Sequence, residues 1–183
     1  MSKTPKWEKW MPSPLPPEAE AFTADGYIQD QDCLHAYSYR TIPACLNCCG
    51  PAAIFNLRLR AGQHPDLPEM LLEMERMHLF HVPGPTRVRV MRLCLDKYLP
   101  GWQEIKGRSR SLHAAANSEM GIFRYRETGI PHYVAYYAVG GGRFRFFNVS
   151  DQIGEDCFSM DRFGLEHCIC EPVRLFFWPA HRI

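Results

Sequence analysis

The sequence lacks any long hydrophobic run, and no stretch approaches the roughly 20 consecutive apolar residues that a membrane-spanning helix requires. Its beginning, MSKTPKWEKW, has lysines but no apolar segment after them, which does not fit a secretory signal peptide. Neither sign of charge is in excess, because 21 Lys and Arg residues are balanced by 20 Asp and Glu residues. A net charge of +1 gives no general attraction to nucleic acid or to an anionic membrane, and we expect neither as a partner.

The sequence has eight cysteines, an even number that would suggest disulfides in a secreted protein, but it lacks an export signal. Reduced thiols in a cytoplasmic protein are the better interpretation. There is no internal repeat, and the run Gly140-Gly141-Gly142 lacks the strand–GxGxxG–helix context of a nucleotide site. We therefore expect no cofactor.

Proline is concentrated at the start of the chain. Residues 1–20 contain five prolines, a density that prevents a helix or a central strand. We predict a proline-rich arm over residues 1–20, followed by a single domain over residues 21–183. A domain of this length, in a chain that is 46% apolar, can bury a sizeable core.

The sequence pattern of the first half of the domain predicts helices. Pro51 suits the first turn of a helix over residues 50–60, and Gly62 suits its end. An acidic first turn and a helical apolar stripe predict a second helix over residues 68–80. A third helix is expected over residues 86–99, and a short one over residues 111–120.

The second half changes to β-branched and aromatic runs, which predict strands. The triple glycine separates two of these runs and indicates a hairpin. The expected strands cover residues 121–127, 132–139, 143–149 and 173–179, with a short helical stretch at residues 159–167. Helices followed by an antiparallel sheet predict an α+β domain.

Two adjacent thiols, Cys48 and Cys49, stand directly before the first predicted helix. The exposed N–H groups at a helix start favour a thiolate over a thiol, so a cysteine there is a candidate nucleophile. Taken alone, a Cys-Cys pair more often consists of buried thiols, and we expect Cys48 to pack inward or to line the site.

A histidine and an asparagine complete the candidate site. His132 opens one strand of the predicted hairpin and Asn148 closes the other. The start of one hairpin strand lies beside the end of the next, so the hairpin brings the two residues together. A base and the group that orients it require this proximity.

The motif NCCGPAA followed by a helix, together with PHYVAYYAVGGGRFRFFN, resembles the papain-like cysteine peptidase superfamily. The likeness covers roughly residues 43–151, and it points towards bacterial peptidases related to the leader-cleaving domain of bacteriocin exporters. It implies a helical lobe whose nucleophile helix packs on a C-terminal antiparallel sheet. It also implies Cys49 as nucleophile, His132 as base and Asn148 as orienting residue in the cleavage of a peptide or protein through a thioester.

Some positions depart from the family pattern. The glutamine that usually stands about six residues before the nucleophile is replaced by Pro43, while Gln29 and Gln31 lie further upstream. Asp151 is a second candidate for the orienting role. We assign substrate binding to Asn47 and Gly50, which flank the two thiols.

The same residues are also compatible with three other functions. The same triad could transfer an acyl group to an amine or thiol acceptor, and a papain-like scaffold could bind a peptide without cleaving it. Four thiols could instead form a structural zinc site, although we expect no metal. These thiols are Cys45, Cys48, Cys168 and Cys170.

Overall fold

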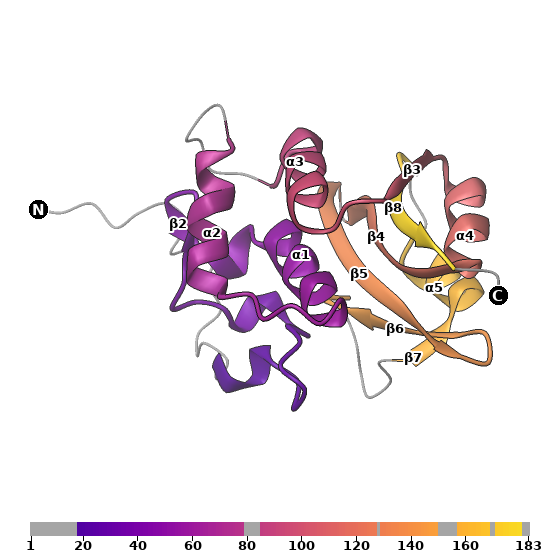
Figure 1. Ribbon diagram of the computed structural model, residues 1–183, viewed down its shortest axis with the longest axis horizontal. Helices are drawn as coiled ribbons and strands as arrows, with labels where there is room; N and C mark the ends of the chain where they lie inside the picture. The colour runs from indigo at the N-terminus through magenta and orange to yellow at the C-terminus, as the bar shows by residue number, and fades with distance from the viewer. Residues whose placement is uncertain (1–17, 79–84, 128, 150–156, 169–170, 181–183) are drawn as a thin grey trace, which may run out of the picture.

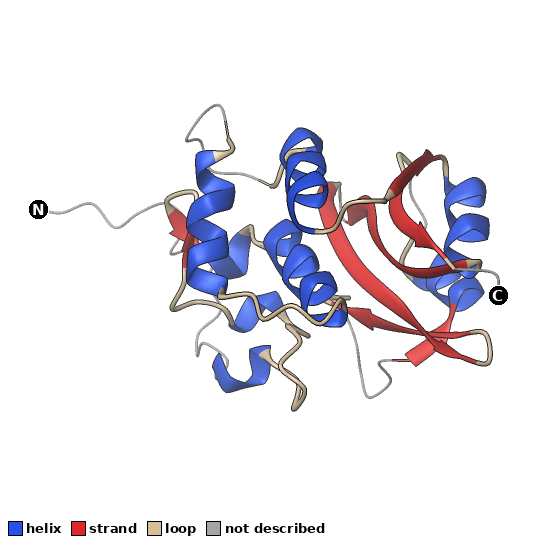
Figure 2. Cartoon of the chain, viewed as in Figure 1, coloured by secondary structure: helices blue, strands red, loops and turns tan. Residues whose placement is uncertain are grey.

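The computed structural model describes residues 18–78, 85–127, 129–149, 157–168 and 171–180. Within these segments an antiparallel sheet stands between two groups of helices (Figures 1 and 2). The predicted α+β organisation is therefore confirmed. Most of the predicted arm, residues 1–17, lies outside the described residues.

The main sheet has six strands in the order β3-β8-β4-β5-β6-β7, and every neighbouring pair is antiparallel. The predicted hairpin is present, since β5 pairs with β6 across the triple glycine, and β4 and β5 are the two central strands. The strands of this sheet are β3 (Gln103–Lys106), β4 (Ser118–Glu127), β5 (Ile130–Gly140), β6 (Arg143–Phe147), β7 (Cys157–Ser159) and β8 (Arg174–Pro179). A separate two-stranded ribbon consists of β1 (Ser38–Tyr39) and β2 (Ile42–Pro43).

Three helices lie on one side of the sheet: α1 (Cys49–Arg60), α2 (Leu67–Arg76) and α3 (Val88–Tyr98) (Figure 1). The side chain of Asp66 caps α2 by accepting the N–H of Glu69 at 2.8 Å, which satisfies one of the open donors at the helix start. No helix among the described segments combines the length and the apolarity needed to cross a membrane.

Two shorter helices, α4 (Arg108–Ala116) and α5 (Met160–Glu166), cover the other side of the sheet. The sheet therefore separates two hydrophobic clusters. We call the cluster on the α1 side the first core and the cluster on the α5 side the second core. Strand β5 supplies both, because successive side chains of a strand point to opposite faces. Tyr133 and Ala135 belong to the first core, whereas Val134 and Tyr136 belong to the second.

The predicted ends of helices and strands differ from the observed ends mainly where pairing with a distant strand sets the boundary. The short helix expected over residues 111–120 ends at Ala116, and residues 118–120 belong to β4. There Met120 pairs with Trp178 of β8, a partner that no local pattern reveals. The second helix, expected over residues 68–80, ends at Arg76. Residues 79–80 lie outside the described residues.

Candidate active site

The two adjacent thiols have different surroundings. Cys48 immediately precedes α1 and is fully buried, and burial raises the pKa of its thiol well above the ordinary value. A buried, protonated thiol is a poor nucleophile. Cys49 is the first residue of α1, whose first turn, described throughout, carries no acidic side chain. Cys48 thus packs inward, and Cys49 is the thiol at the positive end of the helix.

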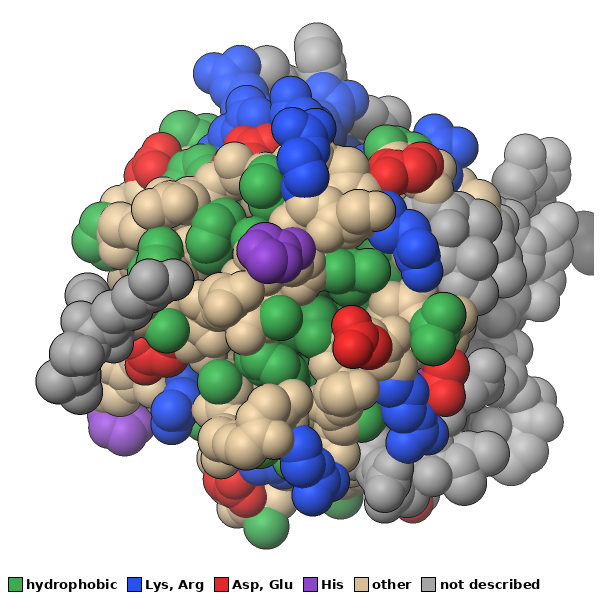
Figure 3. Space-filling model, turned by 90° about the vertical axis from the view of Figure 1, so that its right-hand side faces the viewer, with side chains coloured by type: hydrophobic (Ala, Val, Ile, Leu, Met, Phe, Trp, Pro, Cys, Tyr) green, Lys and Arg blue, Asp and Glu red, His purple; other side chains and the backbone are tan. Residues whose placement is uncertain are grey.

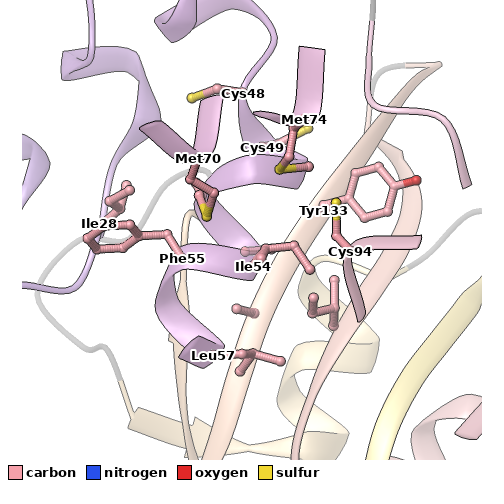
Figure 4. Close-up of a cluster of buried hydrophobic side chains, with 14 of the residues drawn as sticks. Ile28, Cys48, Cys49, Ile54, Phe55, Leu57, Met70, Met74, Cys94 and Tyr133 are labelled. Atoms are coloured by element: carbon pink, nitrogen blue, oxygen red, sulfur yellow. The ribbon is translucent and has the colours of Figure 1, made fainter. Parts of the chain in front are cut away.

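Cys49 lies in the layer between the helices and the sheet. It is 4% exposed and belongs to the first core. Figure 4 shows it in the same cluster as Met74 of α2, Cys94 of α3 and Tyr133 of β5. Burial chiefly, with a smaller contribution from Cys49, raises the pKa of Tyr133. The thiol and this phenol are therefore electrostatic neighbours.

Thr86, which precedes α3, packs against the first turn of α1. The hydroxyl of Tyr133 donates to the carbonyl oxygen of Thr86 at 3.1 Å, and Thr86 Oγ1 lies 3.4 Å from the hydroxyl of Tyr39. A Cβ added at Gly50 would stand 2.4 Å from Thr86 Oγ1. Gly50, assigned from the sequence to substrate binding, therefore allows Thr86 to pack directly against the helix start.

Gly50→Ala is expected to lower the free energy of unfolding by about 1–3 kcal/mol, because an extra methyl in a filled space forces neighbouring atoms to move. Urea-induced unfolding measures this loss. The double variant Gly50→Ala/Thr86→Gly removes the clashing atoms, so its loss should be smaller than the sum of the two single losses. Additive losses would show that Thr86 does not restrict position 50.

The structure brings His132 and Asn148 together, as the hairpin predicts. The Nε2 atom of His132 lies 2.7 Å from the main-chain carbonyl oxygen of Asn148. A carbonyl oxygen only accepts, so Nε2 donates, and in a neutral ring Nδ1 is then the acceptor nitrogen. This tautomer is the one that can take a proton through Nδ1.

The side chain of Asn148 contacts Gln31 rather than the imidazole. Its Oδ1 accepts the main-chain N–H of Gln31, and its Nδ2 donates to Gln31 Oε1, both at 3.0 Å. The Nε2 of Gln31 in turn donates to the carbonyl oxygen of Cys45 at 3.2 Å. Gln31 therefore links the end of β6 to the turn before α1. Sequence reasoning noted it only as an upstream glutamine, since a contact across 117 positions leaves no local pattern.

Asn47, the other residue assigned to substrate binding, is buried and holds the chain locally. Its Nδ2 donates to the carbonyl oxygen of Tyr39 at 2.8 Å, and only 4% of the residue is exposed. This contact fixes the turn before α1 to the β1–β2 ribbon. The side-chain amide of Asn47 therefore binds the main chain of the protein itself, and its predicted role in substrate binding stays a prediction.

Cys49 and His132 come from α1 and β5, which pack together, but the neighbours of the two side chains lie on opposite sides of the sheet. His132 stands opposite Tyr125 in the β4–β5 register, and the two rings contact edge to face at 5.8 Å. Tyr125 belongs to the second core, whereas Cys49 belongs to the first. Among the hydrogen bonds between described residues, none joins the sulfur of Cys49 to the His132 ring.

The zinc alternative does not assemble from the described residues. Cys168 belongs to the second core, on the opposite side of the sheet from Cys48 in the first. Within the described parts of the chain, no group of three or more His, Cys, Asp or Glu side chains is placed to hold a metal ion. Cys170, and Asp151 as the alternative orienting residue, lie outside the described residues.

No protein-family model matches the sequence, and no curated protein matches it. Among solved structures, the chain is similar to the peptidase domain of Streptococcus ComA, a bi-functional ABC transporter involved in a quorum-sensing pathway. The two share 15% sequence identity over 72% of this chain and 91% of that domain, with a TM-score of 0.43.

Proposed function

We propose that this protein is a thiol-dependent hydrolase that cleaves an amide bond in a peptide or protein. Cys49 is the nucleophile, His132 is the base, and Asn148 orients the imidazole through its carbonyl oxygen. The observation that carries this proposal is the contact from His132 Nε2 to that carbonyl, at 2.7 Å, which makes Nδ1 the proton acceptor. Strand β5, which holds His132, is also the strand whose Tyr133 neighbours Cys49.

In the proposed reaction, Cys49 transfers its proton to His132 Nδ1 and the sulfur attacks the substrate carbonyl carbon. Main-chain N–H groups at the start of α1 stabilise the oxyanion. The imidazolium then protonates the leaving amine as the carbon–nitrogen bond breaks, which leaves a thioester on Cys49. Water, deprotonated by His132, hydrolyses the thioester and restores the thiol. The reaction requires Nδ1 to reach hydrogen-bond distance of the sulfur, so the His132 ring must turn from Tyr125 towards the start of α1.

Iodoacetamide labelling tests this proposal, because alkylation requires a thiolate. We expect fast labelling of Cys49 between about pH 6 and pH 8, located by mass spectrometry of peptides. His132→Ala should slow it about tenfold by removing the base. Labelling that rises only with the profile of an ordinary thiol, and that is unchanged in His132→Ala, would contradict the proposal.

Other thiols of the chain serve as internal controls for this experiment. Burial raises the pKa of Cys45 to about 11 and that of Cys94 to about 12. Raising a thiol pKa favours the protonated form, so both should stay unlabelled until the pH approaches these values or the chain unfolds. Cys157 is half-buried and provides the reference for a more accessible thiol.

A non-catalytic peptide-binding scaffold is the second candidate, and one observation favours it. Cys49 is nearly fully buried in the first core, while the His132 ring contacts Tyr125 of the second. A scaffold requires no thiolate, so it predicts slow labelling of Cys49 even when a peptide is bound. The labelling experiment, repeated with peptide present, therefore separates the two candidates.

A further inference from the structure

Three cations form a row across the sheet beside the candidate site. Lys106 of β3 stands opposite Arg174 of β8, and Arg174 stands opposite Arg124 of β4. The next residue in the same register is Tyr133 of β5, which neighbours Cys49. Arg126 lies two residues beyond Arg124 and therefore on the same face. We call Lys106, Arg174, Arg124 and Arg126 the basic row.

The basic row faces the helices α1 and α3. The guanidinium of Arg124 lies 5.9 Å from the centre of the Tyr133 ring, and Tyr133 belongs to the first core. Arg124 and Arg174 both act on the pKa of Tyr133, as Cys49 does, so their charges converge near the candidate nucleophile. Figure 1 shows β3, β8 and β4 side by side at one end of the sheet. Figure 3 shows the molecule from the side of α4 and α5, the other face of the sheet, with Lys and Arg side chains gathered along the upper edge.

The described acidic side chains neutralise only part of this charge. Glu104 of β3 pairs with both Arg174 and Arg92. Over the described residues, no ion pair engages Lys106, Arg124 or Arg126. The Nε of Arg124 is buried without a hydrogen-bond partner in the structure. Like charges directly opposite one another destabilise a sheet, and Glu104 offsets only the charge of Arg174 in the basic row, so a further anion beside Arg124 would favour the folded state.

We propose that the basic row binds carboxylate side chains of an acidic peptide, which makes the substrate of the proposed hydrolase an acidic segment. This inference rests on the proposed function, since it places the peptide beside Cys49. Strands lie about 4.8 Å apart, so the three-strand row spans about 10 Å, the reach of about three extended residues. Arg binds carboxylates through paired hydrogen bonds, which suits short-range recognition. A chain of net charge +1 lacks the broad positive field that nucleic-acid binding uses.

Fluorescence anisotropy with the full chain tests the row directly. The probe is a fluorescein-labelled twelve-residue peptide containing four Glu, compared with its counterpart in which every Glu is Gln. We expect the Glu peptide to bind about tenfold more tightly, and binding to weaken as salt rises from about 50 to 200 mM. The variant Lys106→Gln/Arg126→Gln, which changes two exposed members of the row, should bind the Glu peptide about tenfold more weakly.

The control variant is Arg143→Gln/Arg162→Gln, which makes the same change in net charge on β6 and α5. It should keep the affinity for the Glu peptide. Equal weakening by both variants would overturn the inference, because net charge rather than the row would then decide. Equally tight binding of a single-stranded oligonucleotide of four phosphates would also overturn it, by showing an unselective anion surface.

The outcome separates this inference from the proposed function, because the binding measurement does not use Cys49 chemistry. If binding depends on the basic row but Cys49 labels with the pH profile of an ordinary thiol, the acidic partner is supported and the hydrolase proposal is wrong. Fast, His132-dependent labelling without any preference for the Glu peptide supports the hydrolase and removes the acidic substrate.

Discussion

Replacing Phe163 by alanine is expected to lower the free energy of unfolding by about 3–5 kcal/mol. Phe163 is fully buried on α5, and its ring stacks on Phe146 at 4.6 Å with an angle of 14° between the planes. It also contacts the ring of Phe123 at 4.8 Å. Truncation removes these contacts and leaves a cavity that surrounding rings on a paired sheet cannot fill. Urea-induced unfolding followed by circular dichroism measures the loss.

Leu165→Ala is the matched control on the same helix. Leu165 is 72% exposed, so we expect a change within about 0.5 kcal/mol. Similar losses in both variants would show that α5 responds to helix propensity rather than to packing in the second core. Because Phe163 lies across the sheet from Cys49, labelling of Cys49 in the folded variant should match that of the natural protein.

Asn148→Ala should lower the free energy of unfolding by about 2–4 kcal/mol, as the sum of two effects. First, Asn148 has a φ of +62°, a backbone conformation that asparagine adopts more readily than alanine. Second, its side chain makes two hydrogen bonds to Gln31 and is buried, so truncation leaves their partners unsatisfied. The measurement is again urea-induced unfolding.

Two further substitutions separate these effects. Asn148→Gly removes the backbone strain but not the loss of hydrogen bonds, so its cost should be about 1–2 kcal/mol smaller than that of alanine. Asn117→Ala removes an exposed asparagine with a φ of −112° at the end of α4, and should cost less than about 1 kcal/mol. If glycine and alanine at position 148 cost the same, backbone strain contributes nothing there.

The helices and the hairpin could be predicted because their signals are local. Pro51 and the apolar residues after it indicate α1, and the triple glycine with its flanking aromatic runs indicates β5 and β6. Strand β3 was missed because only Ile105 among its four residues is apolar. Strand β7 was missed because three residues are too few to show a period. Both are edge strands, which are held by one neighbour rather than by their own pattern.

The candidate site was predictable in part for the same reason. The proximity of His132 and Asn148 follows from hairpin geometry, and the structure shows it. That the main-chain carbonyl of Asn148 makes this contact could not be foreseen, because it depends on Gln31 holding the side chain. The covering of Gly50 by Thr86 depends likewise on how the chain returns to α3. The triad itself remains a prediction that Cys49 labelling tests.

Strand β8 lies between β3 and β4, and this order has a consequence for synthesis on the ribosome. Strands β4, β5 and β6 are consecutive and can pair as they emerge. Among the described segments strand β3 pairs with β8 alone, and its Glu104 is 70 positions away from Arg174 of β8. A nascent chain that stops short of β8 therefore leaves β3 unpaired and one side of β4 open to other chains. Translation must therefore deliver residues 174–179 before β3 can join the sheet.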